Sequence, residues 1–430
     1  MNMRIIRTDD VEFESFFRQI RERGRTFDPE LWGSVGRIVE DVALRGDEAL
    51  FDYTARWDGH DLNAATVEAS AEEKKAAAAQ VDPNDLEILR LAANRIERFH
   101  ERQLQEGWSV TDEKGVELGQ SILPLTRVGI YAPGGLACYP STVLMTAIPA
   151  RIAGVSEIIL VTPSRDGKLH PLIAAAAELG GVHRIFKIGG AQAIAALAFG
   201  TASVPCVDKI VGPGNAYVAT AKKMVFGRVA IDMIAGPSEV LIIADGSGSA
   251  AFAAADLLAQ AEHDEMASAV LMTPDGAFAQ AVVSETSRQL ENLARKDIAS
   301  RSLAAYAAAF VTKDLGEAVD LANRFAPEHL ELMVENPRAL LPGIRNAGAV
   351  FLGMYAPEAL GDYTAGPNHV LPTGGTARFT SPLGVYDFIK RTSLISFSRD
   401  ALLMYGRQTA RFAEMEGLDG HGRSVRLRLG

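Results

Sequence analysis

The chain has 430 residues, of which 48% are hydrophobic and 23% charged, and its formal net charge is −11 at pH 7. A chain of this length and composition can bury a core without disulfides or a structural metal, which excludes wholesale disorder and a collagen-like rod. The acidic balance argues against a protein that binds nucleic-acid phosphates or anionic lipid through a basic face.

The N-terminal segment turns acidic by Asp9 and has no apolar stretch typical of a signal peptide. The only cysteines, Cys138 and Cys206, form no CxxC pair, which indicates a reducing compartment and excludes a disulfide framework or a cysteine-based zinc cluster. Two uncharged stretches, 128–150 and 188–207, are interrupted by glycines and prolines, so they predict buried strand–turn–helix units and not membrane spans. We expect a cytoplasmic protein without membrane or nucleic-acid partners.

Residues 1 to about 110 predict a helical region, because apolar residues such as Val35, Ile38 and Val42 recur at helical spacing. From Arg127 the pattern changes to short apolar runs separated by helix-like segments, which is typical of βαβ units in a parallel sheet. A first series of predicted strands covers 128–131, 157–162, 184–188 and 209–211. The helices of this series are predicted at 141–153, 171–179, 191–199 and 215–225.

A second series predicts another α/β unit. Its strands are predicted at 240–244, 269–273, 309–312, 330–334 and 349–352. Its helices are predicted at 250–262, 277–293 and 315–325. A helix-like segment at 400–413 and the glycine-rich EGLDGHGRS predict a small C-terminal appendage. The fold class is therefore α/β, with two Rossmann-like parallel-sheet lobes that meet near Gly236-Pro237-Ser238.

Three glycine-rich turns, APGGLACYPST, IGGAQAI and VGPGNAY, follow predicted strands of the first series. Turns of this kind let main-chain N–H groups approach a phosphate at the start of a helix. None of them completes the G-x-G-x-x-G pattern, so the lobe is of an incomplete dinucleotide-binding type. From these residues alone, glycines that merely make tight turns stay the alternative.

Two pairs of polar residues could carry chemistry. Gln260 and His263 lie three residues apart on a predicted helix, which is a reasonable spacing for metal ligands, although a solvated helix end is the alternative. Glu328 and His329 precede a predicted strand and could transfer protons, although this segment by itself favours a simple polar strand entry. On a regular strand these two side chains would face opposite sides, so both reach one site only from the turn after Pro327.

The segment LGDYTAGPNHVLPTGGTARF concentrates Asp362, Asn368 and His369 with almost no helix or strand periodicity. A long loop of this kind in a compact domain is usually functional. His421, between two glycines near the C-terminus, could reach a site only through tertiary or quaternary contact. Cys138 has no basic neighbour in the sequence that would lower the pKa of its thiol, so we interpret it as a small apolar residue and not as a nucleophile.

Taken together, these segments resemble the L-histidinol dehydrogenase family, the last enzyme of histidine biosynthesis. The resemblance covers about Arg127 to Ser393, and EGLDGH extends it to the C-terminus. It is carried, in the order of the family, by VGIYAPGG, GGAQAIAALAFGT, KIVGPGNAYV, DMIAGPSEVLI, LLAQAEHD, FAPEHLE, GDYTAGPNHVLPTGGTARF and SPLGVYDFIKRTS. The first hundred residues match the family only in their helical character.

The resemblance implies one zinc ion per site. Its ligands would be Gln260, His263, Asp362 and His421, a set of O and N donors that manganese or cobalt could also occupy. In this family the metal holds the substrate by its amino and imidazole nitrogens, which is orientation chemistry. Further substrate contacts would be Ser238, His329, His369 and Glu416, and the metal ligands also touch the substrate.

The resemblance also implies an NAD-dependent oxidation of L-histidinol, through L-histidinal, to L-histidine. His329 would take the alcohol proton, and Glu328 would help to activate water for the second oxidation. The NAD contacts would be Tyr131, Gln192 and Asn215, all in the glycine-rich turns of the first lobe.

Members of the family are homodimers whose C-terminal appendage crosses to the partner subunit, so Glu416 and His421 would complete the neighbour's site. The implied division begins with an N-terminal helical segment, 1–22. The main domain, 23–130 with 240–383, carries most zinc and acid–base residues, and the NAD-binding domain is 131–239. The appendage is 384–430.

Three alternatives stay open from the sequence. A relative on the same scaffold could oxidise another polar alcohol, such as a sulfonated diol, although Glu416 and His421 favour histidinol. A metallohydrolase could use zinc, glutamate and histidine to activate water without a redox step. A catalytically silent scaffold or binding protein is the third, and the intact polar set argues against it.

Overall fold

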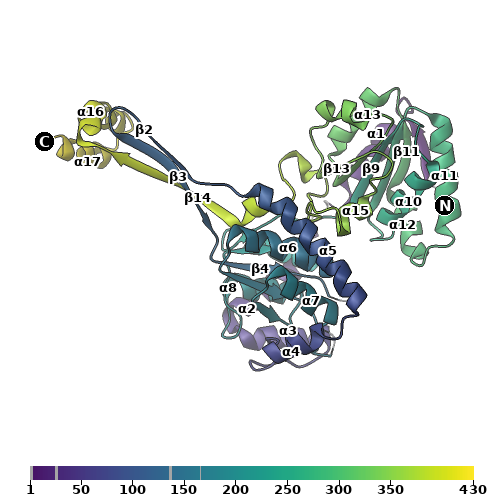
Figure 1. Cartoon of the computed structure of the whole chain (residues 1–430), viewed down its shortest axis with the longest axis horizontal. Helices are drawn as coiled ribbons and strands as arrows, with labels where there is room; N and C mark the ends of the chain where they lie inside the picture. The colour runs from purple at the N-terminus through teal and green to yellow at the C-terminus, as the bar shows by residue number, and fades with distance from the viewer. Residues whose placement is uncertain (1–2, 25–27, 135–137, 165) are drawn as a thin grey trace.

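The structure is a computed structural model that describes residues 3–24, 28–134, 138–164 and 166–430 of the chain. Two α/β lobes, each built on a parallel sheet, are joined side by side, and an arm projects from one of them (Figure 1). The predicted α/β class with two parallel-sheet lobes and a C-terminal appendage is therefore confirmed.

One lobe, called the six-stranded lobe, contains a sheet in which every neighbouring pair of strands is parallel. In spatial order the strands are β1 (Arg4–Arg7), β11 (Ala307–Val311), β10 (Ser268–Thr273), β9 (Glu239–Ala244), β12 (His329–Met333) and β13 (Ala349–Leu352). Strands β9 to β12 are buried at every position, which is typical of a parallel sheet covered on both faces.

Helices cover both faces of this sheet. They are α1 (Phe13–Glu22), α10 (Ala250–Ala261), α11 (Gly276–Leu290), α12 (Lys296–Tyr306), α13 (Leu315–Phe325), α14 (Pro337–Leu340) and α15 (Glu358–Tyr363). Helices α10, α11 and α12 share a core with one face, and α1 and α13 share a core with the other. Because strand side chains alternate between faces, His329 and Met333 lie on the α10 face, whereas Leu330 and Leu332 lie on the α13 face.

The five-stranded lobe has a second parallel sheet. In spatial order its strands are β6 (Arg184–Phe186), β5 (Glu157–Val161), β4 (Arg127–Tyr131), β7 (Lys209–Val211) and β8 (Ala230–Ile231). The chain moves outward from β4 to β5 and β6, then returns to the other side of β4 as β7. The strand order therefore reverses between β4 and β7, which is where ligands bind in open sheets of this type.

Helices from two parts of the chain cover the five-stranded sheet. They are α2 (Pro29–Arg45), α3 (Asp47–Asp58), α4 (Ala71–Ala78), α5 (Pro83–His100), α6 (Pro140–Ala153), α7 (Pro171–Gly180), α8 (Gly190–Phe199) and α9 (Ala216–Val225). One face buries residues of α5, α6 and α7, and the other buries residues of α2, α8 and α9. Single turns of 3-10 helix occur elsewhere, as η1 (Glu101–Gln103), η2 (Leu341–Gly343), η3 (Thr376–Arg378) and η4 (Val385–Phe388).

Helices α2 to α5 pack on the five-stranded lobe, because their apolar stripes are buried against α6, α7, α8 and α9. Helix α5 also contacts the other part of the chain, since Arg95 donates to the main-chain oxygens of Thr364 and Ala365. The first residues depart from the predicted helical region. Residues Arg4–Arg7 form strand β1, which pairs in parallel with β11 at the edge of the six-stranded sheet. Four residues are too short a segment to show a strand period in the sequence.

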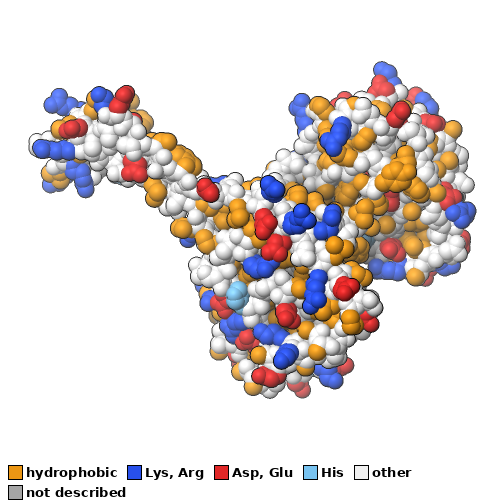
Figure 2. Space-filling view, in the orientation of Figure 1, with side chains coloured by type: hydrophobic (Ala, Val, Ile, Leu, Met, Phe, Trp, Pro, Cys, Tyr) orange, Lys and Arg blue, Asp and Glu red, His pale blue; other side chains and the backbone are white. Residues whose placement is uncertain are grey.

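The arm consists of an antiparallel three-stranded sheet with two helices at its tip (Figure 1). Its elements are β2 (Trp108–Thr111), β3 (Val116–Pro124), β14 (Ile389–Phe397), α16 (Arg399–Met415) and α17 (Asp419–Leu429). Figure 2 shows apolar side chains on the surface of the arm. Apolar residues of the arm that are exposed in the single chain include Val110, Ile395, Phe412 and Met415. Among the described helices, none is both long and apolar enough to cross a lipid bilayer.

Candidate functional site

Three predicted site residues meet at the amino-terminal edge of the six-stranded sheet. His329 is the first residue of β12 and lies in register with Val240 of β9, so the segments that enter these two strands run side by side. Glu328 precedes β12 directly, and Ser238 precedes β9. The turn after Pro327, which the sequence required if both side chains were to reach one site, is present. It begins at Ala326, which adopts a left-handed conformation with φ 56° at the end of α13.

His329 is a buried imidazole whose two nitrogens have different environments. Its Nδ1 lies 3.1 Å from the main-chain oxygen of Glu239. Because a carbonyl oxygen can only accept, Nδ1 carries the hydrogen and Nε2 keeps its lone pair. Nε2 has no hydrogen-bond partner among the described residues, and it lies 3.9 Å from Oδ1 of Asp362. Burial lowers the pKa of His329 to about 3, so the ring is neutral and Nε2 can accept a proton.

Glu328 lies beside His329 and is buried as deeply, since only 5% of its surface is exposed. Its Oε2 accepts a hydrogen bond of 3.1 Å from the N–H of Glu239 and lies 3.9 Å from Nδ1 of His329. Burial, followed by the charge of Glu239, raises the pKa of Glu328 well above its ordinary value. The site therefore pairs a neutral imidazole with a carboxyl group that holds its proton more tightly than usual.

Two of the predicted metal ligands of this lobe, His263 and Asp362, are brought together. Gln260 lies in the last turn of α10 and is fully buried, and neither its Oε1 nor its Nε2 has a hydrogen-bond partner within the described residues. His263 follows the end of the same helix. Ligand atoms of His263, Asp362 and Glu358 all lie within 4.8 Å of one another. A buried amide without partners beside this O and N donor set fits a divalent cation such as zinc.

Glu358 is a site residue that the sequence reasoning missed. It is the first residue of α15, and Asp362 lies four residues later, so both carboxylates project from one side of the helix. The Glu358 N–H donates a hydrogen bond of 2.8 Å to Oε1 of Glu331, while its own Oε2 has no partner among the described residues. Burial, followed by the charges of Asp362 and Glu328, raises the pKa of Glu358 well above its ordinary value. The i, i+4 spacing was the available signal, but it lies in a segment without helical periodicity.

Asp362 and His369 complete the part of the site that comes from residues 358–369. Burial raises the pKa of Asp362 to about 7. His369 Nδ1 lies 3.0 Å from the main-chain oxygen of Asp362 and therefore donates to it, which leaves the Nε2 lone pair free. Burial lowers the pKa of His369 to about 4. Asn368, which the sequence singled out with them, is buried and structural: its amide donates to the main-chain oxygen of Met145 on α6 and its Oδ1 accepts from Val370 N–H.

The structure of the single chain does not bring Glu416 and His421 to this site. Glu416 ends α16 and His421 lies in α17, and both are exposed at the tip of the arm. Figure 1 shows the arm at one end of the molecule and the six-stranded lobe at the other. Within one chain, the predicted ligand set is therefore Gln260, His263 and Asp362, with Glu358 beside them.

The predicted NAD contacts lie at the carboxyl edge of the five-stranded sheet. Tyr131 ends β4, and its hydroxyl accepts a hydrogen bond of 3.1 Å from the N–H of Gly190 at the start of α8. Gln192 is buried in the first turn of α8, and its Oε1 has no partner among the described residues. Asn215 follows β7 and caps α9 by accepting from Tyr217 and Val218 N–H groups. Residues 135–137 of the first glycine-rich turn lie outside the described residues.

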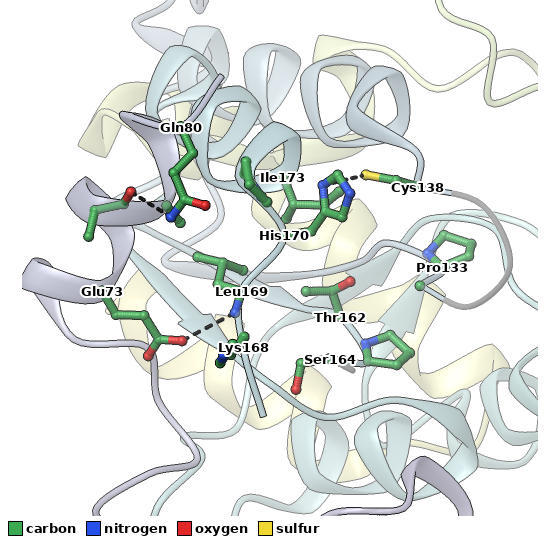
Figure 3. Close-up of a pocket in the computed structure, with 15 residues that line it drawn as sticks. Glu73, Gln80, Pro133, Cys138, Thr162, Ser164, Lys168, Leu169, His170 and Ile173 are labelled. Atoms are coloured by element: carbon green, nitrogen blue, oxygen red, sulfur yellow. Dashed lines mark hydrogen bonds between the residues drawn. The ribbon is translucent and has the colours of Figure 1, made fainter. Parts of the chain in front are cut away.

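A separate cavity of about 510 Å³ lies between α4 and the start of α7 (Figure 3). None of the predicted catalytic, metal or NAD residues lines it, but Cys138 and His170 do. His170 Nδ1 accepts from the N–H of Leu172, so its contact of 3.3 Å with the Cys138 sulfur makes the thiol the donor. Burial raises the pKa of Cys138 to about 11. These contacts agree with the interpretation of Cys138 as a residue that is not a nucleophile.

Comparison with known proteins identifies the family. Residues 21–429 match the family model described as histidinol dehydrogenase. The histidinol dehydrogenase of Syntrophotalea carbinolica is 57% identical over 427 residues, which cover 99% of each chain. That of Geobacter sulfurreducens is 54% identical over 428 residues, covering 99% of this chain and 100% of the relative. The crystal structure of histidinol dehydrogenase from Elizabethkingia anophelis superposes with a TM-score of 0.93 at 37% identity, covering 99% of this chain and 98% of that one. This chain belongs to the histidinol dehydrogenase family.

Proposed function

We propose that this protein catalyses the last oxidation of histidine biosynthesis, in which L-histidinol is converted through L-histidinal to L-histidine. Two NAD molecules accept one hydride each, and one water is consumed. The observation that carries the proposal is the neutral, buried His329. Its Nε2 has no hydrogen-bond partner among the described residues and lies 3.9 Å from Asp362, which belongs to the cluster of His263, Glu358 and Asp362.

His329 acts as the base for the alcohol. Its Nε2 is the nitrogen without a hydrogen, and the Nδ1–H bond to Glu239 holds the ring in the orientation that presents it. The proton that leaves the substrate hydroxyl goes to Nε2, and the resulting imidazolium is stabilised by the nearby carboxylate of Asp362. An imidazole that is neutral across the physiological pH range is ready to accept that proton without first losing one of its own.

Glu328 acts in the second oxidation, where the bound aldehyde must be hydrated before it can lose a hydride. Its side chain lies beside His329, and in its ionised form it can take a proton from the water molecule that attacks the aldehyde carbon. The raised pKa of Glu328 makes its carboxylate a stronger base than an exposed glutamate.

Zinc held by Gln260, His263 and Asp362, together with His421 of the partner subunit, would orient the amino and imidazole nitrogens of the substrate. Glu358 lies within reach of the same ligand atoms. His369 and Ser238 border the acid–base pair and are proposed substrate contacts. Glu416 of the partner subunit would meet the substrate ammonium group as an anion. Tyr131, Gln192 and Asn215 are the proposed NAD contacts.

The arrangement implies a homodimer in which the arms are exchanged. Its support is the arm itself, which exposes apolar side chains such as Ile395 (71% exposed) and Met415 (69% exposed) and projects away from the rest of its own chain (Figure 2). An isolated three-stranded sheet with apolar side chains in water gains stability when a second chain covers it. We propose that the protein acts in the cytoplasm, where its cysteines Cys138 and Cys206 would stay unpaired, as they are in the structure.

The experiment that tests the reaction measures NADH absorbance with limiting L-histidinol, with and without a zinc chelator. We expect two equivalents of NADH per histidinol, with the reaction abolished by chelation and restored by zinc. One equivalent would instead identify an alcohol dehydrogenase that releases its aldehyde. No NADH from zinc-loaded protein would contradict the proposal and direct the search to other alcohols or to hydrolysis.

Exchange of the arms is tested by mixing two inactive chains. One carries His263→Asn and the other His421→Asn, and the two are produced together in equal amounts. If His421 serves the partner's site, half of the dimers are hybrids with one intact site, which restores about one quarter of the wild-type activity. If His421 serves its own chain, no intact site can form and the mixture stays inactive.

A further inference from the structure

Arg23, directly after α1, is a buried arginine whose contacts converge on the segment that leads into β9. Its Nη2 contacts the main-chain oxygens of Pro237 at 3.3 Å and Ser238 at 3.1 Å, and Oε2 of Glu239 at 2.8 Å. The side chains of Arg23 and Glu239 are each only 1% exposed. Two further bonds of 2.9 Å anchor the guanidinium, from Nε to the Met266 oxygen and from Nη1 to the Ile20 oxygen.

The residue held by Arg23 in turn holds both acid–base side chains. The N–H of Glu239 donates to Oε2 of Glu328, and its main-chain oxygen accepts from Nδ1 of His329. Glu239 therefore contacts Arg23 through its carboxylate and the catalytic pair through its backbone. The two bonds belong to the peptide units on either side of the Glu239 Cα atom, so a small displacement of this residue would lengthen both bonds at once. It would also move away the acceptor that keeps the hydrogen on Nδ1 of His329.

The sequence around Arg23 favours this close approach. Gly24 has φ +70°, and a Cβ atom there would lie 2.7 Å from Cδ of Pro237, so glycine lets the turn pack directly on the segment before β9. The planar guanidinium offers five N–H donors in a fixed geometry, and five acceptors surround it here. A lysine has three donors on one atom and could satisfy only some of them.

We propose that Arg23 is a positioning residue for the reaction. Through Glu239 it fixes the two adjoining peptide units, of which one positions Glu328 and the other sets the tautomer of His329. Arg23 lies more than two hundred residues before these side chains in the sequence and touches neither of them. The inference rests on the proposed function in so far as the acid–base pair is catalytic, but the geometric claim about His329 stands apart from the identity of the substrate.

The test compares three variants of the full-length, zinc-loaded protein. Arg23→Met with Glu239→Gln removes the ion pair without leaving a buried unpaired charge, and Arg23→Lys keeps the charge but not the planar donor set. Phe17→Leu is the matched control, because Phe17 packs α1 onto the same lobe through Phe13, Phe310 and Phe325 and touches none of the site residues. Thermal unfolding of all three measures how far each change loosens α1.

For the double variant we expect kcat to fall about 10- to 100-fold, the range typical of a catalytic group displaced by about 1 Å. KM for histidinol and the zinc content stay within about threefold of wild type, since the metal ligands are not part of these contacts. Arg23→Lys recovers part of kcat. A double variant that keeps kcat within about threefold of wild type, or loses no more than Phe17→Leu does, would overturn the proposal.

A second readout separates this inference from the proposed reaction. The chain has eight histidines, so selective ¹⁵N labelling gives few ring signals, and His329→Asn assigns that of His329. Wild type should show the Nδ1–H form, and the double variant a mixture of tautomers. If wild type does not oxidise histidinol but this change occurs, the proposed function fails and the positioning role stands. If wild type is active but the tautomer is unchanged in the double variant, the positioning role fails alone.

Discussion

The proposed functional residues lie at opposite edges of the two parallel sheets. In the five-stranded lobe, Tyr131 and Asn215 lie at the carboxyl ends of the strands, where open α/β sheets usually bind ligands. In the six-stranded lobe, Glu328 and His329 lie at the amino ends of the strands. The difference matters because each edge collects the opposite ends of the connecting helices.

Helix termini give the two edges opposite electrostatic character. Helices α8 and α9 begin at the carboxyl edge of the five-stranded sheet, and their N–H groups favour anions such as the phosphates of a dinucleotide. Helices α10 and α13 end at the amino edge of the six-stranded sheet, where carbonyl groups favour cations. A metal ion and a substrate with an ammonium group suit this second edge. Two similar parallel sheets can therefore favour ligands of opposite charge, if the residues that bind them lie at opposite edges of the sheets.

The largest effect should come from removing a ligand at the cation-binding edge. His263→Asn is expected to weaken zinc binding at least about 100-fold and to leave less than about 0.1 zinc per chain after dialysis. Activity should fall with the zinc content, because the substrate loses the ion that orients it. The fold should persist, since His263 lies past the end of α10 and not in the core.

Metal analysis and circular dichroism check this prediction, with His170→Asn as the same change in the other lobe. His170 lines the cavity of Figure 3 and is not a proposed ligand, so its variant should keep its zinc. Zinc retained by His263→Asn, or lost equally from both variants, would break the assignment of the cation to the six-stranded lobe.

A smaller loss is expected from a backbone contact beneath the acid–base pair. The N–H of Gly348 donates a hydrogen bond of 2.9 Å to the main-chain oxygen of Pro327. A Cβ atom at position 348 would lie 2.6 Å from the main-chain oxygen of Glu328. In Gly348→Ala the turn carrying Glu328 must shift, so we expect about 1–3 kcal/mol less stability and kcat about 10- to 100-fold lower. KM for NAD should stay unchanged, because the five-stranded lobe is not touched.

Denaturant unfolding and steady-state kinetics measure both effects. Gly276→Ala is the matched control in the same lobe, since a Cβ atom at Gly276 has no heavy atom within 4 Å among the described residues. A normal kcat for Gly348→Ala, or an equal loss in the control, would show that the position of Glu328 does not depend on this contact.

Much of this architecture could be predicted from the sequence, because the patterns that indicate strands, helices and turns are local. Strands such as Lys209–Val211 and helices such as Leu315–Phe325 were predicted at the bounds that the structure gives. Apolar runs of fixed period and glycine-rich turns depend only on near neighbours in the chain. The same holds for Glu328 and His329, whose place at the start of a strand could be predicted from FAPEHLE.

The features that the sequence did not predict depend on contacts between residues far apart in the chain. Strand β3 pairs with β14 across more than two hundred residues, and its many exposed positions give no clean alternation, so the arm sheet was missed. Arg23 and Glu358 were not predicted as site residues, because the role of each depends on contacts with residues on other elements. Helix α17 forms despite the glycines of EGLDGHGRS and packs on α16, which its local composition did not predict.

A third prediction concerns the buried carboxyl groups that distinguish the six-stranded lobe. Asp256 on α10 faces Glu331 on β12, and burial raises the pKa of Asp256 to about 6 and that of Glu331 well above its ordinary value. Groups with raised pKa values favour folding below their unfolded pKa, and this contribution is lost as the pH rises through the folded value. Asp256→Asn removes the titration of one partner, and its amide can donate to an ionised Glu331.

We therefore expect the stability of Asp256→Asn relative to wild type to increase by about 1–2 kcal/mol between pH 5 and pH 8. Urea unfolding of both proteins at the two pH values measures the difference. A relative stability that does not change with pH would mean that the pair is not a buried site of shared protons.

The smallest effect tests the other side of the comparison. Tyr131→Phe removes the hydroxyl that accepts from the Gly190 N–H, which leaves a donor unpaired at the start of α8. Burial raises the pKa of Tyr131 to about 12, so the group that is lost is a neutral phenol and not a charge. The loss is worth about 0.5–1.5 kcal/mol, and it should raise KM for NAD by up to about tenfold. KM for histidinol and the zinc content should not change, and Tyr306→Phe in the six-stranded lobe is the control. If Tyr131→Phe weakened histidinol binding instead, the two edges would not divide the anionic and cationic ligands between them.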